Sequence, residues 1–192
     1  MNEDRQKFLT SLYYPATFVL FLWIIKLVET MFNLSLAGYG LLPRQAKGLI
    51  GIITTPLLHA DFNHLISNSL PLIFLGTGLF YFYKEASIKT ALIIYFAPSM
   101  IVWIFGRDAY HIGASGLIYG LVTFMFFSGI IRRDARSIAL SLVVTFLYGS
   151  LVWGVLPLDA KVSWESHLAG AFVGFICALL FKKLDVYKRY DW

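Results

Sequence analysis

The sequence has little charge and almost no cysteine. Lysine, arginine, aspartate and glutamate make up 14% of the 192 residues, whereas a soluble domain carries about 25%. This shortage all but excludes a soluble globular enzyme, a disordered chain and a nucleic-acid-binding protein. The single cysteine, Cys177, lies in an apolar run and cannot form an intrachain disulfide. We interpret it as a small buried residue.

Hydrophobic residues, in contrast, make up 58% of the chain. They gather in runs that suit membrane-spanning helices, and six spans of about 20 residues would use about 120 residues. What remains is enough for short loops and tails. The predicted fold is therefore an all-α membrane bundle, a single domain over 1–192, with spans at about 15–32, 62–82, 88–105, 114–131, 138–156 and 166–181.

The stretch between the first two spans is interrupted too often by glycine and proline to cross a membrane. We predict that residues 33–60 form a long outer loop at the membrane surface, with short amphipathic helices. Asp61 follows as a candidate N-cap of the second span. In the first span, Lys26 and Glu29 have i,i+3 spacing, which indicates either an ion pair on one helix face or the outer membrane interface.

The distribution of lysine and arginine predicts the orientation. If the N-terminus is cytoplasmic, eleven of these residues fall in cytoplasmic segments and four in outer segments. The positive-inside rule then places both termini in the cytoplasm of a cell whose inner membrane the chain crosses repeatedly. In this orientation all four histidines lie on the outer side, at His59, His64, His111 and His167. Ionisable groups at membrane depth suggest function, so a chemical site is expected there.

Three polar residues from different spans share one depth. At a rise of 1.5 Å per residue, Asn68, Ser115 and His167 lie roughly 22 to 25 Å above the cytoplasmic boundary. Taken singly, a serine is usually a packing residue and an asparagine or histidine an interhelical hydrogen-bonding group. Their common depth, with His64 one turn above Asn68 on the same face, favours a shared site.

The residues around Ser115 suit a nucleophile. Gly113 permits a tight loop into a helix N-terminus, where free backbone N–H groups and the helix dipole favour an anion. Tyr119 lies one turn below Ser115, at a suitable place to pack against an imidazole. Two GxxxG pairs predict close approach of the fourth and sixth spans; they are Gly116 with Gly120, and Gly170 with Gly174.

Three motifs, in order, carry a family resemblance from about residue 34 to 180. They are His59-Ala-Asp-Phe-Asn-His64-Leu-Ile-Ser-Asn68, Gly113-Ala-Ser115-Gly116, and Ser166-His167-Leu-Ala-Gly170-Ala-Phe-Val-Gly174. Together they resemble those of the rhomboid intramembrane serine proteases. The resemblance implies Ser115 as nucleophile and His167 as general base. It also implies that His64, Asn68 and the Ser115 N–H stabilise the oxyanion, with Tyr119 supporting His167.

The same resemblance implies substrates that are single-span membrane proteins, cleaved near the outer membrane boundary. It implies lipid contact and no cofactor, metal or nucleic acid. The outer acidic residues are not evidently placed to orient His167, so we expect a Ser–His dyad. We expect the first loop and the fifth span, with Gly149, to provide a lateral gate.

The sequence departs from the family in several places. Many rhomboids carry a Trp-Arg pair where this chain has Ile50 and Gly51, and some have a histidine at the position of Thr55. Ser166 stands where alanine is frequent. These differences concern loop packing and substrate handling.

Alternatives remain open at this point. One is a catalytically silent rhomboid-like protein that binds membrane helices. A second is an intramembrane metalloprotease, which the spacing of His59 and His64 does not favour, because no HExxH motif occurs. A third is a small transporter, which would show internal repeats. His111 is interpreted as a bystander to the site.

Overall fold

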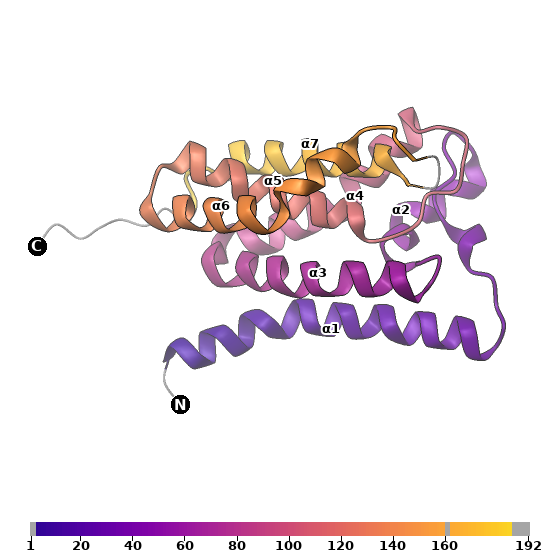
Figure 1. Ribbon diagram of the computed structural model, residues 1–192, viewed down its shortest axis with the longest axis horizontal. Helices are drawn as coiled ribbons and strands as arrows, with labels where there is room; N and C mark the ends of the chain where they lie inside the picture. The colour runs from indigo at the N-terminus through magenta and orange to yellow at the C-terminus, as the bar shows by residue number, and fades with distance from the viewer. Residues whose placement is uncertain (1–2, 160–161, 186–192) are drawn as a thin grey trace, which may run out of the picture.

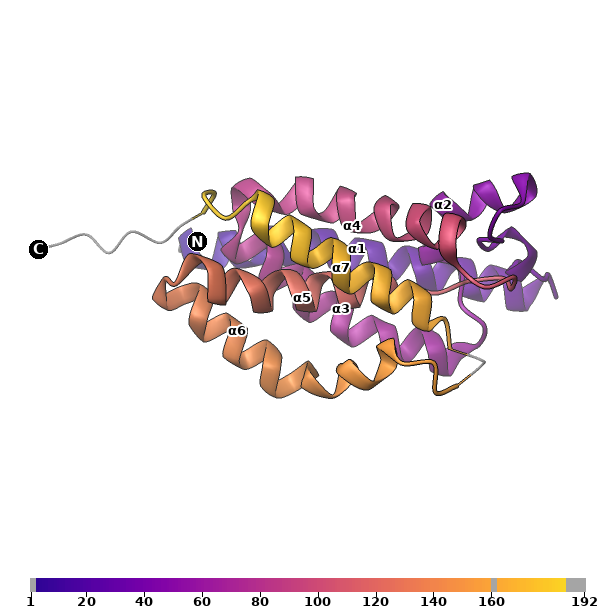
Figure 2. The same ribbon diagram turned by 90° about the horizontal axis from the view of Figure 1, so that it is seen from above.

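The computed structural model describes residues 3–159 and 162–185. Six longer helices run side by side along one axis, with α1 and α3 forming one side of the bundle (Figure 1). Figure 2 shows α7 crossing the bundle beside α4 and α5, with α6 at one margin. Their bounds are α1 Glu3–Met31, α3 Phe62–Phe82, α4 Lys84–Phe105, α5 Ser115–Arg132, α6 Ala135–Tyr148 and α7 Trp164–Leu180.

Among residues 3–159 and 162–185, five helical segments are long and apolar enough to cross a membrane, namely α1, α3, α4, α5 and the continuous stretch Ala135–Val155. The helix α7, with 17 residues, is a shorter apolar helix, still within the range of about 17–25 residues that spanning helices show. Within the described ranges the only β-pairing is a single bridge between Leu41 and His111. The predicted all-α membrane bundle is confirmed.

The segment between α1 and α3 contains only short helices. These are η1 Ala37–Tyr39, η2 Ala46–Ile50, α2 Gly51–Thr54 and η3 Thr55–Leu57. The segment folds at the end of the bundle where α1 ends and where α3, α5 and α7 begin (Figures 1 and 2). It is fastened to the loop before α5, because Leu41 and His111 exchange backbone hydrogen bonds of 3.0 and 2.8 Å. The interruptions in the sequence therefore correspond to a folded cap rather than to a span.

The first turns of two helices are capped by aspartate. Asp61 accepts a hydrogen bond of 2.8 Å from the backbone N–H of His64 at the start of α3, as the sequence predicts. Asp134 does the same for Ser137 at the start of α6. Such caps satisfy N–H groups that a helix leaves unpaired in its first turn. The cap at Asp61 also fixes where His64 stands on α3.

The helices α5 and α7 pack with their backbones in contact. A Cβ atom at Gly170 would overlap the carbonyl oxygen of Gly116, and one at Gly174 would overlap that of Gly120. These four glycines define what we call the α5–α7 interface. Small residues allow helices in a membrane to approach closely. The first turns of α5 and α7 are thereby brought together at the capped end of the bundle.

Candidate active site

Ser115 and His167 meet across the α5–α7 interface. Ser115 is the first residue of α5, and His167 lies in the first turn of α7. The His167 Nε2 atom lies 2.7 Å from the Ser115 Oγ atom. His167 is buried, with 8% of its surface exposed, while Ser115 is partly exposed. The arrangement places a hydroxyl next to an imidazole at a helix start.

The other ring nitrogen of His167 has a backbone partner. Nδ1 lies 2.8 Å from the carbonyl oxygen of Gly154, in the short helix η4 Gly149–Val155 that follows α6. A carbonyl oxygen can only accept a hydrogen bond, so the proton of the neutral ring is on Nδ1. Nε2 then carries the lone pair and accepts the Ser115 hydroxyl proton.

The Tyr119 ring covers one face of the His167 imidazole. The two rings are stacked, with centroids 4.2 Å apart and planes 9° from parallel. The Tyr119 hydroxyl donates a hydrogen bond of 2.8 Å to the carbonyl of Leu151. Tyr119 and His167 are therefore both tied to η4. The spacing of Tyr119 from Ser115 predicts this packing. No sequence signal points to Gly154 or Leu151, because these two residues contribute only backbone atoms.

The loop before Ser115 requires glycine. Gly113 has a φ of +115°, a conformation that residues with a side chain rarely adopt. A Cβ atom there would lie 2.6 Å from the His64 Cε1 atom. The Gly113 N–H donates to the carbonyl of Thr55 at 2.9 Å. The His64 ring consequently packs directly against the backbone that leads into Ser115.

Asn68 lies one turn further along α3 than His64. It is buried, with 4% exposure, and within the part of the chain that the structure describes its Nδ2 atom has no hydrogen-bond partner. A buried amide donor without a partner is costly in a membrane protein. It is a donor available to a bound group.

Two further histidines lie close to the site. His59 is 4% exposed and packs edge-on against His64, with centroids 5.0 Å apart. Burial, and to a smaller extent positive charge on His64 and Lys26, lower the pKa of His59 to about 4. His111 is buried too, beside the Ser163 hydroxyl, and burial lowers its pKa. The backbone of His111 is hydrogen-bonded to that of Leu41 in the segment between α1 and α3. This contact agrees with a structural role for His111.

Three of the four positions that depart from the rhomboid pattern are closely packed or hydrogen-bonded here, whereas Ile50 is exposed. A Cβ atom at Gly51 would overlap the backbone of Leu41, so a larger residue does not fit this loop. The Thr55 hydroxyl donates to the carbonyl of His111 and accepts from the Leu41 N–H, each at 3.1 Å. Ser166 shares a hydrogen bond of 2.7 Å with Ser163. The loop keeps its position through small residues and hydroxyl groups.

The fold and the site define a multi-pass all-α membrane protein with a serine and a histidine in contact at one end of its bundle. A family model described as the rhomboid domain matches residues 46–184. The chain belongs to the rhomboid family.

Similar proteins are found in bacteria and plants. An uncharacterized protein of Mycobacterium tuberculosis is 34% identical over 173 residues, covering 85% of this chain and 72% of that protein. An uncharacterized protein of Mycobacterium leprae is 32% identical, covering 85% and 68%. RHOMBOID-like protein 7 of Arabidopsis thaliana is 27% identical, covering 73% of this chain and 44% of that protein.

Proposed function

We propose that this protein is an intramembrane serine protease that cleaves single-span membrane proteins near the outer boundary of the membrane. The observation that carries the proposal is the contact of 2.7 Å between His167 Nε2 and Ser115 Oγ. It is joined by the bond from Nδ1 to the Gly154 carbonyl. A base in hydrogen-bond reach of the nucleophile, itself oriented by a third group, is the general arrangement of nucleophilic catalysis.

The reaction follows from this arrangement. The Ser115 Oγ atom attacks the carbonyl carbon of the peptide bond while its proton passes to His167 Nε2. The resulting tetrahedral intermediate collapses as His167 gives that proton to the leaving amine, which leaves an acyl group on Ser115. Water then attacks the acyl carbon while His167 takes its proton. The bond from that carbon to the Ser115 Oγ atom breaks, His167 returns the proton to Oγ, and the free acid is released.

The negative charge of the tetrahedral intermediate falls at the start of α5. Ser115 is the first residue of that helix, where the backbone N–H has no partner within the helix. His64, packed against Gly113, and the unpartnered amide of Asn68 supply donors from α3. Losing one such donor typically costs about 10² to 10³ in rate.

The Gly154 carbonyl takes the place that a carboxylate has in a Ser-His-Asp triad. It fixes the tautomer and the orientation of His167, but it brings no negative charge to stabilise the imidazolium. The stacked Tyr119 ring holds the imidazole plane. We therefore propose a dyad with a backbone orienting group. The distribution of lysine and arginine supports an orientation with both termini in the cytoplasm and this site on the outer side.

Labelling with a fluorophosphonate tests the proposal. We expect the purified protein to be labelled on Ser115 and to cleave a single-span model substrate. The Ser115→Ala and His167→Ala variants should do neither. Ser128→Ala is the matched control, because Ser128 is a buried serine of the same helix, and it should behave like the unaltered protein. Cleavage by the Ser115→Ala variant would refute the assignment. An unlabelled but folded wild type that binds membrane helices would favour the non-catalytic alternative.

A further inference from the structure

The charged pair Lys26 and Glu29, near the outer end of the apolar helix α1, has no role in the reaction proposed above. The Lys26 Nζ atom lies 2.8 Å from the Glu29 Oε2 atom, so the i,i+3 pair is an ion pair. Both side chains are largely buried, with 11% and 14% exposure. Ionisable residues within a membrane span are expensive and usually serve a function. The question is what this pair does in the fold.

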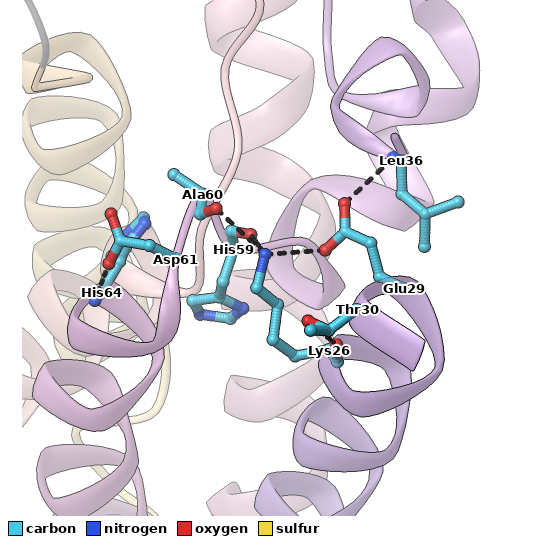
Figure 3. Close-up of polar contacts among 8 residues, drawn as sticks. All are labelled: Lys26, Glu29, Thr30, Leu36, His59, Ala60, Asp61 and His64. Carbon is cyan, nitrogen blue, oxygen red and sulfur yellow. Dashed lines mark hydrogen bonds and ion pairs between the residues drawn. The ribbon is translucent and has the colours of Figure 1, made fainter. Parts of the chain in front are cut away.

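Lys26 donates its other two hydrogen bonds to the backbone of the segment that leads into α3. Its Nζ atom donates to the carbonyl of His59 at 3.0 Å and to that of Ala60 at 2.9 Å (Figure 3). With the bond to Glu29, these contacts use all three protons of the ammonium group. An ammonium group thus fully satisfied is one that can be kept in a buried place.

Glu29 extends the connection to the start of the first loop. Its second carboxylate oxygen, Oε1, accepts a hydrogen bond of 3.0 Å from the backbone N–H of Leu36. Figure 3 shows the pair between the end of α1 and the segment that enters α3. The ion pair therefore joins three parts of the chain: the outer end of α1, the start of the loop and the entry to α3.

The entry to α3 is directly connected to the site. Asp61, next to Ala60, caps the helix at the His64 N–H. The His59 ring packs against the His64 ring, and His64 packs against Gly113. A shift of the His59 and Ala60 carbonyls, which Lys26 holds, would move both the His59 ring and the Asp61 cap. These two groups fix His64. This connection runs through backbone and ring contacts and reaches the oxyanion donors on α3 but not His167.

We propose that Lys26 is a positioning residue for the oxyanion side of the site, holding the His59 and Ala60 carbonyls so that His64 and the first turn of α3 stay beside the Ser115 loop. This inference rests on the proposed function for its effect on catalysis. The anchoring itself is a structural statement that can be tested separately. It makes α1, which contributes no residue to the Ser–His pair, a part of the site.

The test is the Lys26→Met variant, which keeps an unbranched apolar stem and removes the three donors. A displacement of about 1 Å at a site can cost about 10² in rate, and a full oxyanion donor about 10² to 10³. We expect kcat to fall by about 10- to 100-fold, with KM changed by less than about twofold. The midpoint of the pH–rate profile should stay in place, because the bonds of His167 to Ser115 and Gly154 are untouched.

Two companion variants separate positioning from stability. The double variant Lys26→Met/Glu29→Gln removes the unpaired charge but keeps an acceptor for the Leu36 N–H, so the thermal stability should largely return while kcat stays low. Lys7→Met is the matched control, because Lys7 joins the same two helices at the other end by lying 4.4 Å from the centre of the Tyr81 ring. It should leave kcat unchanged.

The outcomes decide between the interpretations. A low kcat in the double variant with restored stability supports positioning. Recovery of kcat together with stability, or an unchanged kcat in Lys26→Met, overturns it. If the wild type neither labels nor cleaves, the proposed function fails by itself, and hydrogen–deuterium exchange over residues 58–66 decides the anchoring. Faster exchange there in Lys26→Met than in Lys7→Met supports the anchor, and equal exchange refutes it.

Discussion

The two elements that contact His167 are held in the bundle in opposite ways. The helix α5 is packed closely, with 50% of its most apolar stretch buried, whereas the corresponding share for Ala135–Val155, which we call the α6–η4 segment, is 11%. An apolar groove of about 390 Å³ lies between that segment and the helices α5 and α7. The proposed nucleophile and base, Ser115 and His167, therefore stand on the closely packed part of the molecule. Their orienting carbonyls come from the loosely packed part.

This difference suggests a division of labour. The distance between Ser115 and His167 is set by backbone contacts between glycines, which leave no room for adjustment. The tautomer and tilt of His167 depend instead on Gly154 and, through Tyr119, on Leu151. Movement of the α6–η4 segment would break both hydrogen bonds without separating the Ser–His pair. We therefore expect mutations in the two regions to differ in the kind of effect as well as in its size.

The largest effect is expected from Gly170→Ala at the α5–α7 interface. The added Cβ would overlap the Gly116 carbonyl oxygen, which is backbone and cannot turn aside, so the helices must separate. Overpacking of this kind costs about 1–3 kcal/mol or more, and a shift of about 1 Å costs about 10² in rate. Fluorophosphonate labelling should become at least about 100-fold slower, and the melting temperature should fall. Normal labelling in this variant would show that the interface is not rigid.

Acid should act on the loop side of the site through His59, a buried histidine that lies outside the α5–α7 interface. The pKa of His59 is about 4 in the fold, against 6.5 in an ordinary setting. Between pH 4 and pH 6.5, His59 therefore binds a proton in the unfolded chain but not in the folded chain. The contribution of a neutral His59 to stability is therefore fully present above pH 6.5 and is lost as the pH is lowered to 4.

The expected loss for His59 is up to about 3 kcal/mol, or roughly 5–10 °C in melting temperature. Thermal unfolding in detergent at pH 7 and pH 4.5 measures it. In His59→Phe, which keeps an aromatic ring against His64, the difference between the two pH values should shrink. The part that remains is assigned to the other buried histidines, His111 included. An equal acid effect in both proteins would contradict the assignment to His59.

These expectations show what sequence reasoning could and could not provide. The depth match of Ser115 with His167 and the glycine spacing follow from helical periodicity, and the Asp61 cap follows from its position before an apolar run. The Gly154 carbonyl could not be found this way, because any residue supplies a carbonyl and only the path of the chain brings it to His167. Helix α1 begins at Glu3, twelve residues before the predicted span, since polar residues can continue a helix beyond the membrane.

The partners of Lys26 could likewise be predicted only in part from the sequence. Its spacing to Glu29 allowed an ion pair or an interface marker, and the structure has the ion pair. Its two other partners are backbone carbonyls of residues 59 and 60, contacts over a long sequence separation that no local pattern encodes. Side-chain chemistry is visible in a sequence, whereas backbone partners appear only once the fold is known.

A smaller effect is expected from Tyr119→Phe, which tests the connection between the two regions. The ring remains stacked on His167, but the hydrogen bond to the Leu151 carbonyl is lost. A hydrogen bond contributes about 1 kcal/mol net, so kcat/KM should fall by about three- to tenfold. Tyr95→Phe is the control, since it removes a similar bond, from a tyrosine hydroxyl to the Ile53 carbonyl, in α4. Equal losses in the two variants would count against a special role for Tyr119.

The smallest effect is expected from Gly149→Ala, the same substitution as Gly170→Ala but placed where α6 passes into η4. Gly149 has helical dihedral angles, φ −59° and ψ −28°, and a Cβ there meets only the Thr145 methyl group at 3.9 Å. Alanine should therefore stabilise the fold by about 0.4–1 kcal/mol, which is a rise of about 1–4 °C in melting temperature.

Labelling by a small fluorophosphonate should be unchanged in Gly149→Ala, because the α5–α7 interface is untouched. If the α6–η4 segment must bend to admit a transmembrane substrate, stiffening this junction should slow cleavage of that substrate by about twofold. If Gly149→Ala cleaves the transmembrane substrate as fast as the wild type does, bending at Gly149 is not part of substrate entry.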